Sequence, residues 1–402
     1  MIKLHFNFKD VFRAARLAFS PKKLWIQFCG LFLGSIFYAI FAYLTLMAEG
    51  QGIVEIWGSY HWLPLLPLEQ VLGFAWYSWI LFIIGCLLFL ITTLFANTLV
   101  CKIAFEQLKG NEFFEIKESM KFLKENWKAV IGAPFTIFLF TFFILICGFI
   151  LGLWGKIPYV GEISVVLLTI PIFFVCVFIV FLLIVLGFSL KLSPAIVATT
   201  KSDTFDTVFE SFSTVTSQPW RLVLYEFLLG AIAWLGLVIL STASRWALWI
   251  AKAELGWNVL MGDKLLGIID KALVYLPPLK EFCLRLCPQL SPSEPCAFLE
   301  GIGLGLTPSG LGIPLSGWGE FCAFLLGIFL WLIVLTVLSY FFAIGSVGQT
   351  LIYTILVKMK DEKNLLEKKE EEEKPFEEIK PAEEKKEEEK KEEEKKEEEK
   401  KE

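Results

Sequence analysis

Three segments of the chain place apolar residues at the spacing of an amphipathic helix, and each precedes a long hydrophobic run. In the second segment, 111–127, the apolar positions are Phe113, Ile116, Met120, Leu123 and Trp127, and lysines flank them. Spacings of three and four put these side chains on one stripe of a helix. A basic, aromatic, amphipathic helix that leads directly into a hydrophobic run is typical of a helix lying in the membrane interface.

The same stripe recurs at two fixed offsets. A shift of 92 residues gives Phe205, Val208, Phe212 and Val215, and a shift back by 105 gives Phe8, Val11, Ala15 and Ala18. We therefore predict three interfacial helices, termed elbow helices, at about 7–20, 111–127 and 203–217. Either Ser202 or Asp203 is expected to cap the third one. Such repeats usually show how a fold is built; the alternative is that the elbows clamp the bilayer or bind lipid head groups.

The hydrophobic runs predict six membrane-spanning helices, because about 20 apolar residues cross the bilayer core. The expected spans are 24–48, 74–98, 129–155, 163–190, 222–241 and 321–345, with the last one either ending there or running on to 357. Pro171 is expected to kink the fourth span. The predicted fold is thus an all-α polytopic membrane protein, built as three repeats of an elbow helix plus a helical hairpin.

The chain divides by composition into a membrane domain, 1–358, and a Glu/Lys-rich tail, 359–402. The 402 residues are 56% hydrophobic and 15% aromatic, which indicates a multi-span membrane protein. From Asp361 onward there are 21 acidic and 13 basic residues, so the net charge of −5 comes from the tail. The domain contains a long outer segment, 245–320, which begins with an amphipathic helix at 257–276. No nucleic-acid-binding motif is present.

Loop charge predicts the orientation. The short loops on one side carry Lys102, Lys109, Lys117, Lys121, Lys124, Lys128, Lys191, Lys201 and Arg221, whereas those on the other side carry only Lys156. The positive-inside rule places the basic side, both termini and the elbows in the cytoplasm. We expect a bacterial inner-membrane protein with Trp25, Trp127, Trp220 and Arg221 as interfacial anchors.

Polar residues inside the spans are few. Asn97, Glu226 and Gln349 are the candidates for an intramembrane polar site. Glu226 could bind a cation or a substrate, or it could pair with Arg221 or another basic group. The scarcity of charge counts against a proton-coupled pump but not against a carrier of lipid or apolar solute. Convergence of the three residues on one cavity would favour a carrier, and scattering to the interfaces would favour a scaffold.

Three cysteines of the outer segment, Cys283, Cys287 and Cys296, form the second candidate site. A disulfide from Cys283 or Cys287 to Cys296, free thiols and a three-thiolate metal site are all compatible with the spacing. No histidine lies nearby, since the chain has only His5 and His61.

Catalytic motifs are missing from the sequence. It contains no nucleophile elbow, P-loop or HExxH pattern. The glycines at Gly301, Gly303 and Gly305 follow no predicted strand, and His61 is expected to lie in a solvated loop with Glu55. We assign no catalytic, cofactor-binding or metal-binding residue and expect no cofactor.

The stretch Ser193–Leu229, SPAIVATTKSDTFDTVFESFSTVTSQPWRLVLYEFLL, carries a family resemblance. An extended exit, an elbow and the Trp220–Arg221 pair lead into a span. In this plan the chain resembles the six-span membrane domain fused to some bacterial glycerophosphoryl diester phosphodiesterases and related uncharacterised inner-membrane proteins. Where those enzymes carry a soluble catalytic domain, this sequence carries the charged tail, so the resemblance assigns no catalytic residue.

The sequence thus predicts an integral inner-membrane protein and favours a non-enzymatic function over an enzyme. The favoured function is a scaffold or accessory protein that contacts membrane lipids, with a protein partner reached through the tail or the elbows. A transporter of a lipid or apolar solute is the alternative, and a membrane-embedded enzyme is the third. The tail is expected to be a partly helical spacer.

Overall fold

The computed structural model describes residues 4–66, 68–257, 259–276, 313–362 and 364–367. The chain divides into two compact units, 1–365 and 366–402, and the fold and site described below lie within the first. In the described residues all regular secondary structure is helical. Cys283, Cys287, Cys296 and most of the tail lie outside the described residues, so the disulfide, free-thiol and metal alternatives stay predictions.

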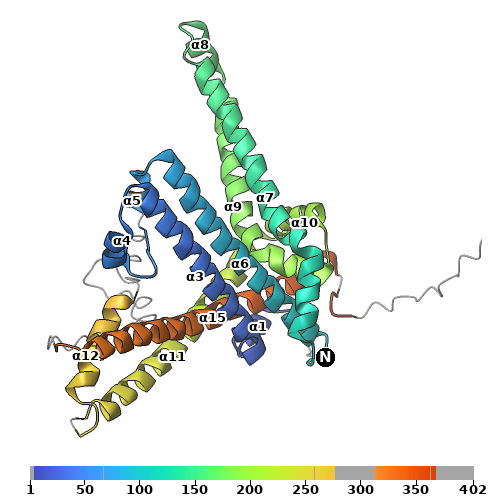
Figure 1. Cartoon of the computed structure of the whole chain (residues 1–402). Helices are drawn as coiled ribbons and strands as arrows, with labels where there is room; N and C mark the ends of the chain where they lie inside the picture. Colours follow the sequence, from blue (N-terminus) through green and yellow to red (C-terminus); the bar gives the residue numbers. More distant parts are fainter. Residues whose placement is uncertain (1–3, 67, 258, 277–312, 363, 368–402) are drawn as a thin grey trace, which may run out of the picture. The chain divides into compact units, whose positions relative to one another are not determined.

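Six helices are long and apolar enough to cross a membrane, which confirms the all-α polytopic fold (Figure 1). They are α3 (Pro21–Ala48), α6 (Trp76–Leu108), α7 (Ile116–Trp154), α9 (Thr169–Thr200), α11 (Pro219–Leu255) and α15 (Gly317–Asp361). With 28 to 45 residues each, all six exceed the about 20 residues that a bilayer core requires. The threefold repeat stays a prediction.

The six helices form three hairpins, α3–α6, α7–α9 and α11–α15, that meet at one end and spread apart toward the other (Figure 1). Helix α15 joins them, because it packs against α3, α6 and α9 as well as against α11. Its residues Ser346–Val357 are all buried. Small residues such as Ser346, Gly348 and Thr350 let neighbouring helices approach this segment closely.

Glycine makes the first hairpin tight. A Cβ at Gly30 of α3 would lie 2.4 Å from the Ala96 Cβ of α6, and one at Gly34 would lie 2.6 Å from the Thr92 Oγ1. Real Cβ atoms do not approach so closely, so these two positions require glycine. The i, i+4 spacing of Gly30 and Gly34 is the small-residue pattern by which membrane helices pack.

The outer half of the second hairpin is largely exposed in the part of the chain that the structure describes. In α7, which the structure describes completely, no residue after Thr141 is buried, and in α9 none before Leu182 is. The exposed side chains here are apolar, among them Phe143, Phe149 and Phe174. Short helix α8 (Val160–Leu167) connects the two at the tip, beyond the expected turn.

The first and third elbows form separate helices. The first is split into α1 (Phe8–Val11) and α2 (Arg13–Ala18), and Pro21 begins α3 directly afterwards. The third is α10 (Thr204–Ser217), and its cap is Asp203, whose carboxylate accepts a hydrogen bond of 2.9 Å from the Asp206 N–H. Proline at the first position of the next helix separates elbow from span in both cases.

The prediction of a separate second elbow is wrong. Residues 116–127 are the first turns of α7, which continues without interruption into the third span. The helix begins at a capping box formed by Glu115 and Glu118, and Phe113 lies before it with 87% of its surface exposed. No proline or glycine lies between 116 and 131 to end the helix, unlike the boundaries at Pro21 and Pro219.

The buried faces of the second and third elbow segments also differ from the predicted stripes. In α7, Ser119 and Phe122 are buried whereas Met120 and Trp127 are exposed. In α10 the residues packed against α7 and α9 are Thr207, Ser211, Thr214 and Val215. Of the predicted stripe only Val215 is buried, and Phe205 is 68% exposed. Small hydroxyl side chains can donate a hydrogen bond to a carbonyl of their own helix, as Ser211 does to the Thr207 carbonyl at 2.8 Å. They therefore permit close packing without leaving a buried polar group unpaired.

Several helices have ends that differ from those predicted from the sequence. Helix α9 continues through Pro194 to Thr200. The expected fourth span is interrupted at Leu168, between α8 and α9, so Pro171 lies in the first turn of α9, where proline is tolerated. The last span runs on past residue 357, to Asp361. In the outer segment, α12 (Asp263–Tyr275) lies within the predicted amphipathic helix. Two further short helices, α4 (Ile53–Tyr60) and α5 (Leu68–Leu72), connect α3 to α6.

Candidate functional site

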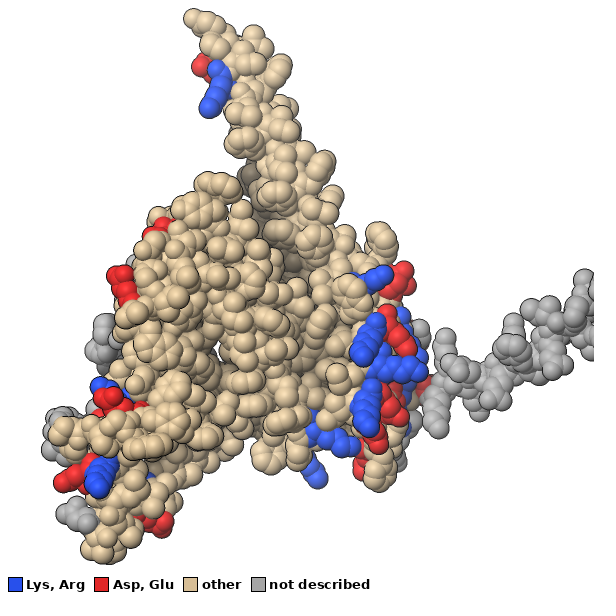
Figure 2. Space-filling model, viewed as in Figure 1, with Lys and Arg blue, Asp and Glu red and all other residues tan. Residues whose placement is uncertain are grey.

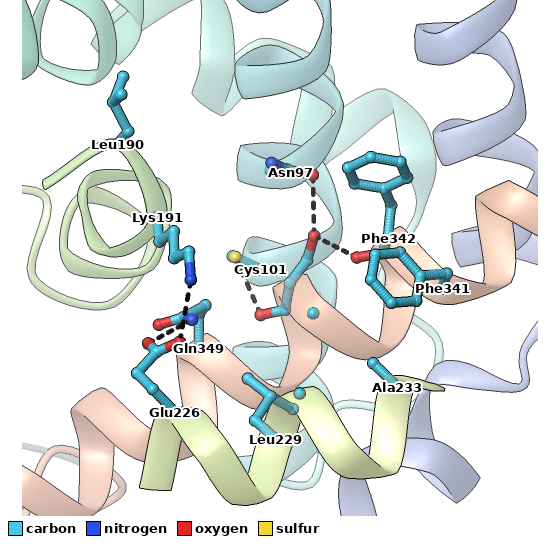
Figure 3. A pocket seen from close by; sticks show the side chains of 13 residues that line it. Asn97, Cys101, Leu190, Lys191, Glu226, Leu229, Ala233, Phe341, Phe342 and Gln349 are labelled. Atoms are coloured by element: carbon cyan, nitrogen blue, oxygen red, sulfur yellow. Dashed lines mark hydrogen bonds and ion pairs between the residues drawn. The ribbon is translucent and has the colours of Figure 1, made fainter. Parts of the chain in front are cut away.

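A pocket of about 220 Å³ lies where the three hairpins meet (Figure 3). Helices α6, α9, α11 and α15 line it. The lining residues are Asn97, Cys101, Leu190, Lys191, Glu226, Leu229, Gly230, Ala233, Phe341, Phe342, Gly345, Ser346 and Gln349. All three residues predicted for an intramembrane polar site, Asn97, Glu226 and Gln349, therefore lie in one cavity, although they come from three different helices.

The polar residues lie well inside their helices. Glu226 is seven residues into α11 and Gln349 is twelve residues before the end of α15. At 1.5 Å per residue these positions are about 10 and 18 Å along the helices from the ends that carry the basic loops. The pocket is thus set among apolar residues and away from the helix termini.

Glu226 has two partners in the pocket. Its Oε1 accepts a hydrogen bond of 2.5 Å from the Gln349 Nε2, and its Oε2 lies 3.5 Å from the Lys191 Nζ. The Glu226 side chain is 12% exposed and that of Lys191 is 61% exposed. The basic partner of Glu226 is therefore Lys191 of α9. Arg221 instead contacts Gln218 and Met359.

The oxygen of the Gln349 amide has no hydrogen-bond partner in the described structure. Gln349 is only 6% exposed, and its Oε1 is a buried acceptor without a donor. The amide orientation follows from chemistry, because the atom 2.5 Å from a carboxylate oxygen must be the N–H donor. An unsatisfied buried acceptor costs about 1–3 kcal/mol, so the hydrogen bond to Glu226 is made at a cost in stability.

Asn97 belongs to a second, connected group at the pocket wall. Its Oδ1 accepts hydrogen bonds from the Gln27 Nε2 at 2.8 Å and from the Ser346 Oγ at 3.0 Å. The Cys101 thiol contacts the Ser346 carbonyl at 3.2 Å. This group ties α3, α6 and α15 together beside the pocket. Figure 3 shows Asn97 and Cys101 at the pocket wall.

Sequence analysis missed two polar residues of this region, Gln27 and Lys191. Gln27 is fully buried, and its position within the uncharged run 24–48 was the available signal. Lys191 was assigned to the exit of the fourth span, because the helix was expected to end beside it. Since α9 continues to Thr200, Lys191 lies inside the helix, opposite Glu226.

Glycine also shapes the pocket wall. A Cβ at Gly348 of α15 would lie 2.0 Å from the Leu229 Cδ1 of α11, so this position admits no side chain while Leu229 lines the pocket. Gly230 also lines the pocket, and a Cβ there would meet no atom within 4 Å. The pocket can therefore be filled by substitution at Gly230 without a collision.

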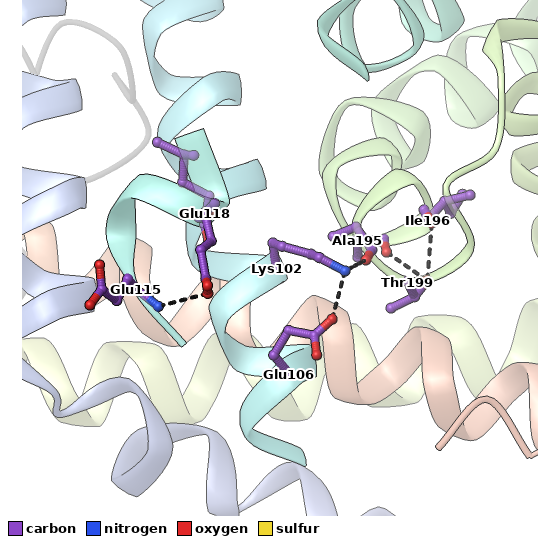
Figure 4. Close-up of polar contacts among 10 residues, drawn as sticks. Lys102, Glu106, Glu115, Glu118, Ala195, Ile196 and Thr199 are labelled. Atoms are coloured by element: carbon purple, nitrogen blue, oxygen red, sulfur yellow. Dashed lines mark hydrogen bonds and ion pairs between the residues drawn. The ribbon is translucent and has the colours of Figure 1, made fainter. Parts of the chain in front are cut away.

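A second charged cluster lies closer to the helix ends and has a structural role (Figure 4). The Lys102 Nζ is 2.7 Å from the Glu106 Oε1, 3.5 Å from the Ala198 carbonyl of α9, and 4.8 Å from the ring centre of Phe122 of α7. Buried charges need such partners. The cluster joins α6, α7 and α9 and lines no part of the pocket described above.

Other predicted residues lie apart from the pocket. Trp25, Trp127 and Trp220 are exposed, and their role as interfacial anchors stays a prediction, as does that of Arg221. The described cysteines are free thiols, and within the described residues no group of three or more His, Cys, Asp or Glu side chains could hold a metal ion.

His61 packs among aromatic side chains, in place of the solvated loop predicted for it. Its ring lies 5.2 Å from that of Tyr275 and 6.1 Å from that of Trp57, measured between centres. This partial burial lowers the pKa of the imidazole below its ordinary value, against a smaller opposing effect of the Trp57 backbone. His61 therefore contributes to the outer aromatic packing that holds α4 on α12 and α15.

Comparison with known proteins gave no match among family models, curated proteins or solved structures. The resemblance to the membrane domain of the phosphodiesterases stays a prediction.

Proposed function

We propose that this integral membrane protein is a carrier that binds an amphiphile, a lipid or an apolar solute with a polar end, in the pocket between its hairpins. The observation that carries the proposal is the convergence of Asn97, Glu226 and Gln349 on one cavity. Polar groups in an apolar surrounding orient a ligand, while the apolar lining holds the rest of it.

The packing of the hairpins supports entry of such a ligand from the side. Helices α9 and α11 both line the pocket, and the contact of Lys191 with Glu226 links them there. An amphiphile in the bilayer reaches Glu226 between these two helices without crossing the interior of a hairpin. We further propose that the basic end of the helices faces the cytoplasm of a bacterial cell. Figure 2 shows lysines and arginines gathered where α7 begins, and Lys117, Lys121 and Lys124 are exposed there.

A scaffold or accessory function is the second candidate. The observation that favours it is the outer half of the α7–α9 hairpin, which is apolar and largely exposed in the described part of the chain. That surface suits lipid or a membrane partner. The scaffold proposal makes no use of the pocket, and this difference separates the two candidates.

The test introduces a large side chain at the pocket wall. Gly230→Phe adds a ring at a residue that lines the pocket, whereas Gly148→Phe adds the same ring on α7, which contributes no residue to the pocket. The full chain is purified in mild detergent, and native mass spectrometry counts the bound lipid, with lipid flipping in vesicles as the second measurement. We expect Gly230→Phe to abolish both and Gly148→Phe to retain both. Equal binding and flipping by the two variants would exclude the carrier proposal and leave the scaffold.

A further inference from the structure

The Glu226 carboxylate is the acceptor that a ligand in the pocket could reach. Its Oε1 accepts the Gln349 N–H at 2.5 Å, and its Oε2 has the Lys191 Nζ at 3.5 Å. The Glu226 side chain is largely buried and lines the pocket. A ligand that binds Glu226 must bring N–H or O–H donors, and a positive charge on it would complement the carboxylate.

Lys191 is a cation in the pocket and would be complemented by an anion on the ligand. Its side chain is 61% exposed, and its contact with Glu226 is a long one of 3.5 Å. A cation from the ligand at Glu226 would leave the lysine ammonium available for an anion on the same ligand. Lys191 and Glu226 come from α9 and α11, so the two charges of the ligand would contact both helices.

The size of the pocket limits what enters it. Cavities that enclose a whole drug-sized ligand measure about 300–1,000 Å³, and this one measures about 220 Å³. It accommodates a polar head group, with hydrocarbon tails left between α9 and α11. A bare metal ion is a poorer fit, since no metal-binding group of three acidic, His or Cys residues occurs in the described residues.

From this geometry we propose that the ligand is a zwitterionic amphiphile with a primary ammonium and a phosphate. The ammonium donates to the Glu226 carboxylate, and the phosphate binds Lys191. The inference rests on the proposed function and narrows it to one class of head group. A quaternary ammonium has no N–H for the Glu226 carboxylate, and an anionic head group has no cation for it.

The test compares three lipids with the same acyl chains. Phosphatidylethanolamine has a primary ammonium, phosphatidylcholine a quaternary one, and phosphatidylglycerol none. Native mass spectrometry of the full chain measures the bound fraction of each. We expect binding of phosphatidylethanolamine to exceed the other two by about tenfold, the ratio expected from one charge-assisted hydrogen bond.

Variants of the two charged residues test whether the preference for phosphatidylethanolamine arises in the pocket. Glu226→Gln should remove the preference for the primary ammonium, and Lys191→Gln should weaken all three lipids through their shared phosphate. Glu210→Gln is the matched control, because Glu210 forms an ion pair of similar length, 3.4 Å, with Lys360 and does not line the pocket. It should leave the preference unchanged.

The outcomes separate this inference from the proposed function. All three lipids could bind equally, and Gly230→Phe could abolish this binding. That result would overturn the head-group assignment and retain the carrier. Lipid binding unaffected by Gly230→Phe would overturn both. Release of bound lipid by an equal concentration of soluble phosphoethanolamine would overturn the assignment to an amphiphile in favour of a water-soluble ligand.

Discussion

Lys102 and Glu106 show how this protein accommodates charge within its helices. Both side chains are largely buried, and their ion pair of 2.7 Å is completed by the Phe122 ring and the Ala198 carbonyl. Removal of one member of a buried pair costs about 3–5 kcal/mol, because the other charge remains without a counter-charge. We expect Glu106→Gln to lower the midpoint of thermal unfolding in detergent strongly.

The double variant Lys102→Met with Glu106→Gln provides the control for this pair. It removes both charges, so it should recover part of the lost stability. If the double variant is less stable than Glu106→Gln alone, then the Lys102 side chain contributes chiefly through its contacts with Phe122 and Ala198.

Asp203 provides a second prediction, at the start of α10. Its carboxylate accepts the Asp206 N–H at 2.9 Å, whereas Ser202 contacts the Thr200 hydroxyl. Loss of such a cap costs about 1 kcal/mol. Asp203→Ala should therefore destabilise the protein by that amount in denaturant unfolding, and Ser202→Ala by less. The opposite order would assign the cap to Ser202.

Single residues of the candidate site could be predicted from the sequence, but their partners could not. Asn97, Glu226 and Gln349 stand out because polar side chains are rare in apolar runs. Their convergence depends on which helices lie side by side, and the pairing of Glu226 with Lys191 depends on α9 continuing through Pro194. Neither fact is encoded by composition or by local spacing.

At the scale of whole helices, the close contact of α3 with α6 depends on glycine. At Gly30 an added Cβ would lie 2.4 Å from the Ala96 Cβ, whereas at Gly148 of α7 it would meet nothing within 4 Å. Gly30→Ala should destabilise the protein by about 1–3 kcal/mol through overpacking. Gly148→Ala, at an open helical position, should be neutral or stabilising by up to about 1 kcal/mol. Thermal unfolding in detergent measures both, and equal midpoints would contradict the close packing.

The third elbow, α10, gives a prediction that corrects the amphipathic stripe. Ser211 is fully buried against the neighbouring helices and Phe205 is exposed. Ser211→Leu should therefore cost about 1–3 kcal/mol in stability, because it overpacks this face. Phe205→Ala should stay within about 0.5 kcal/mol of the parent protein in detergent. A larger loss for Phe205→Ala would restore the face predicted from the sequence.

Elbow boundaries were predictable where proline marks them and not elsewhere. Pro21 and Pro219 begin the helices that follow the first and third elbows. Residues 116–131 contain no such signal, and the change from amphipathic to apolar composition near Trp127 does not end a helix. Periodicity identifies a helix but does not decide which face packs on protein, since a face exposed to lipid is apolar too.

For the whole molecule, loop charge predicts that Ser59 and Glu112 lie on opposite sides of the membrane. Both residues are exposed, the first in α4 and the second in the connection from α6 to α7. In a background free of cysteine, an impermeant maleimide should label Ser59→Cys in intact cells and Glu112→Cys only after permeabilisation. Labelling of both in intact cells would contradict the proposed topology.

The six membrane-spanning helices could be predicted from hydrophobicity, because each contains a long run of almost uncharged residues. The arrangement of the hairpins did not follow, because lipid is as apolar as leucine and gives an apolar helix no preferred side. Small residues decide the packing instead, as at Gly30, Gly34 and Gly348. Their role becomes visible only when the partner helix is known.

The outer half of the α7–α9 hairpin has a consequence for the thickness of the bilayer. None of its α7 residues after Thr141 and none of its α9 residues before Leu182 is buried, so hydrophobic mismatch is expected to change the tilt of this part first. Lys191 lies in the inner part of α9, which packs against α6 and α15. A thinner membrane should therefore bend the outer half of the hairpin and leave in place the wall of the pocket that carries Lys191.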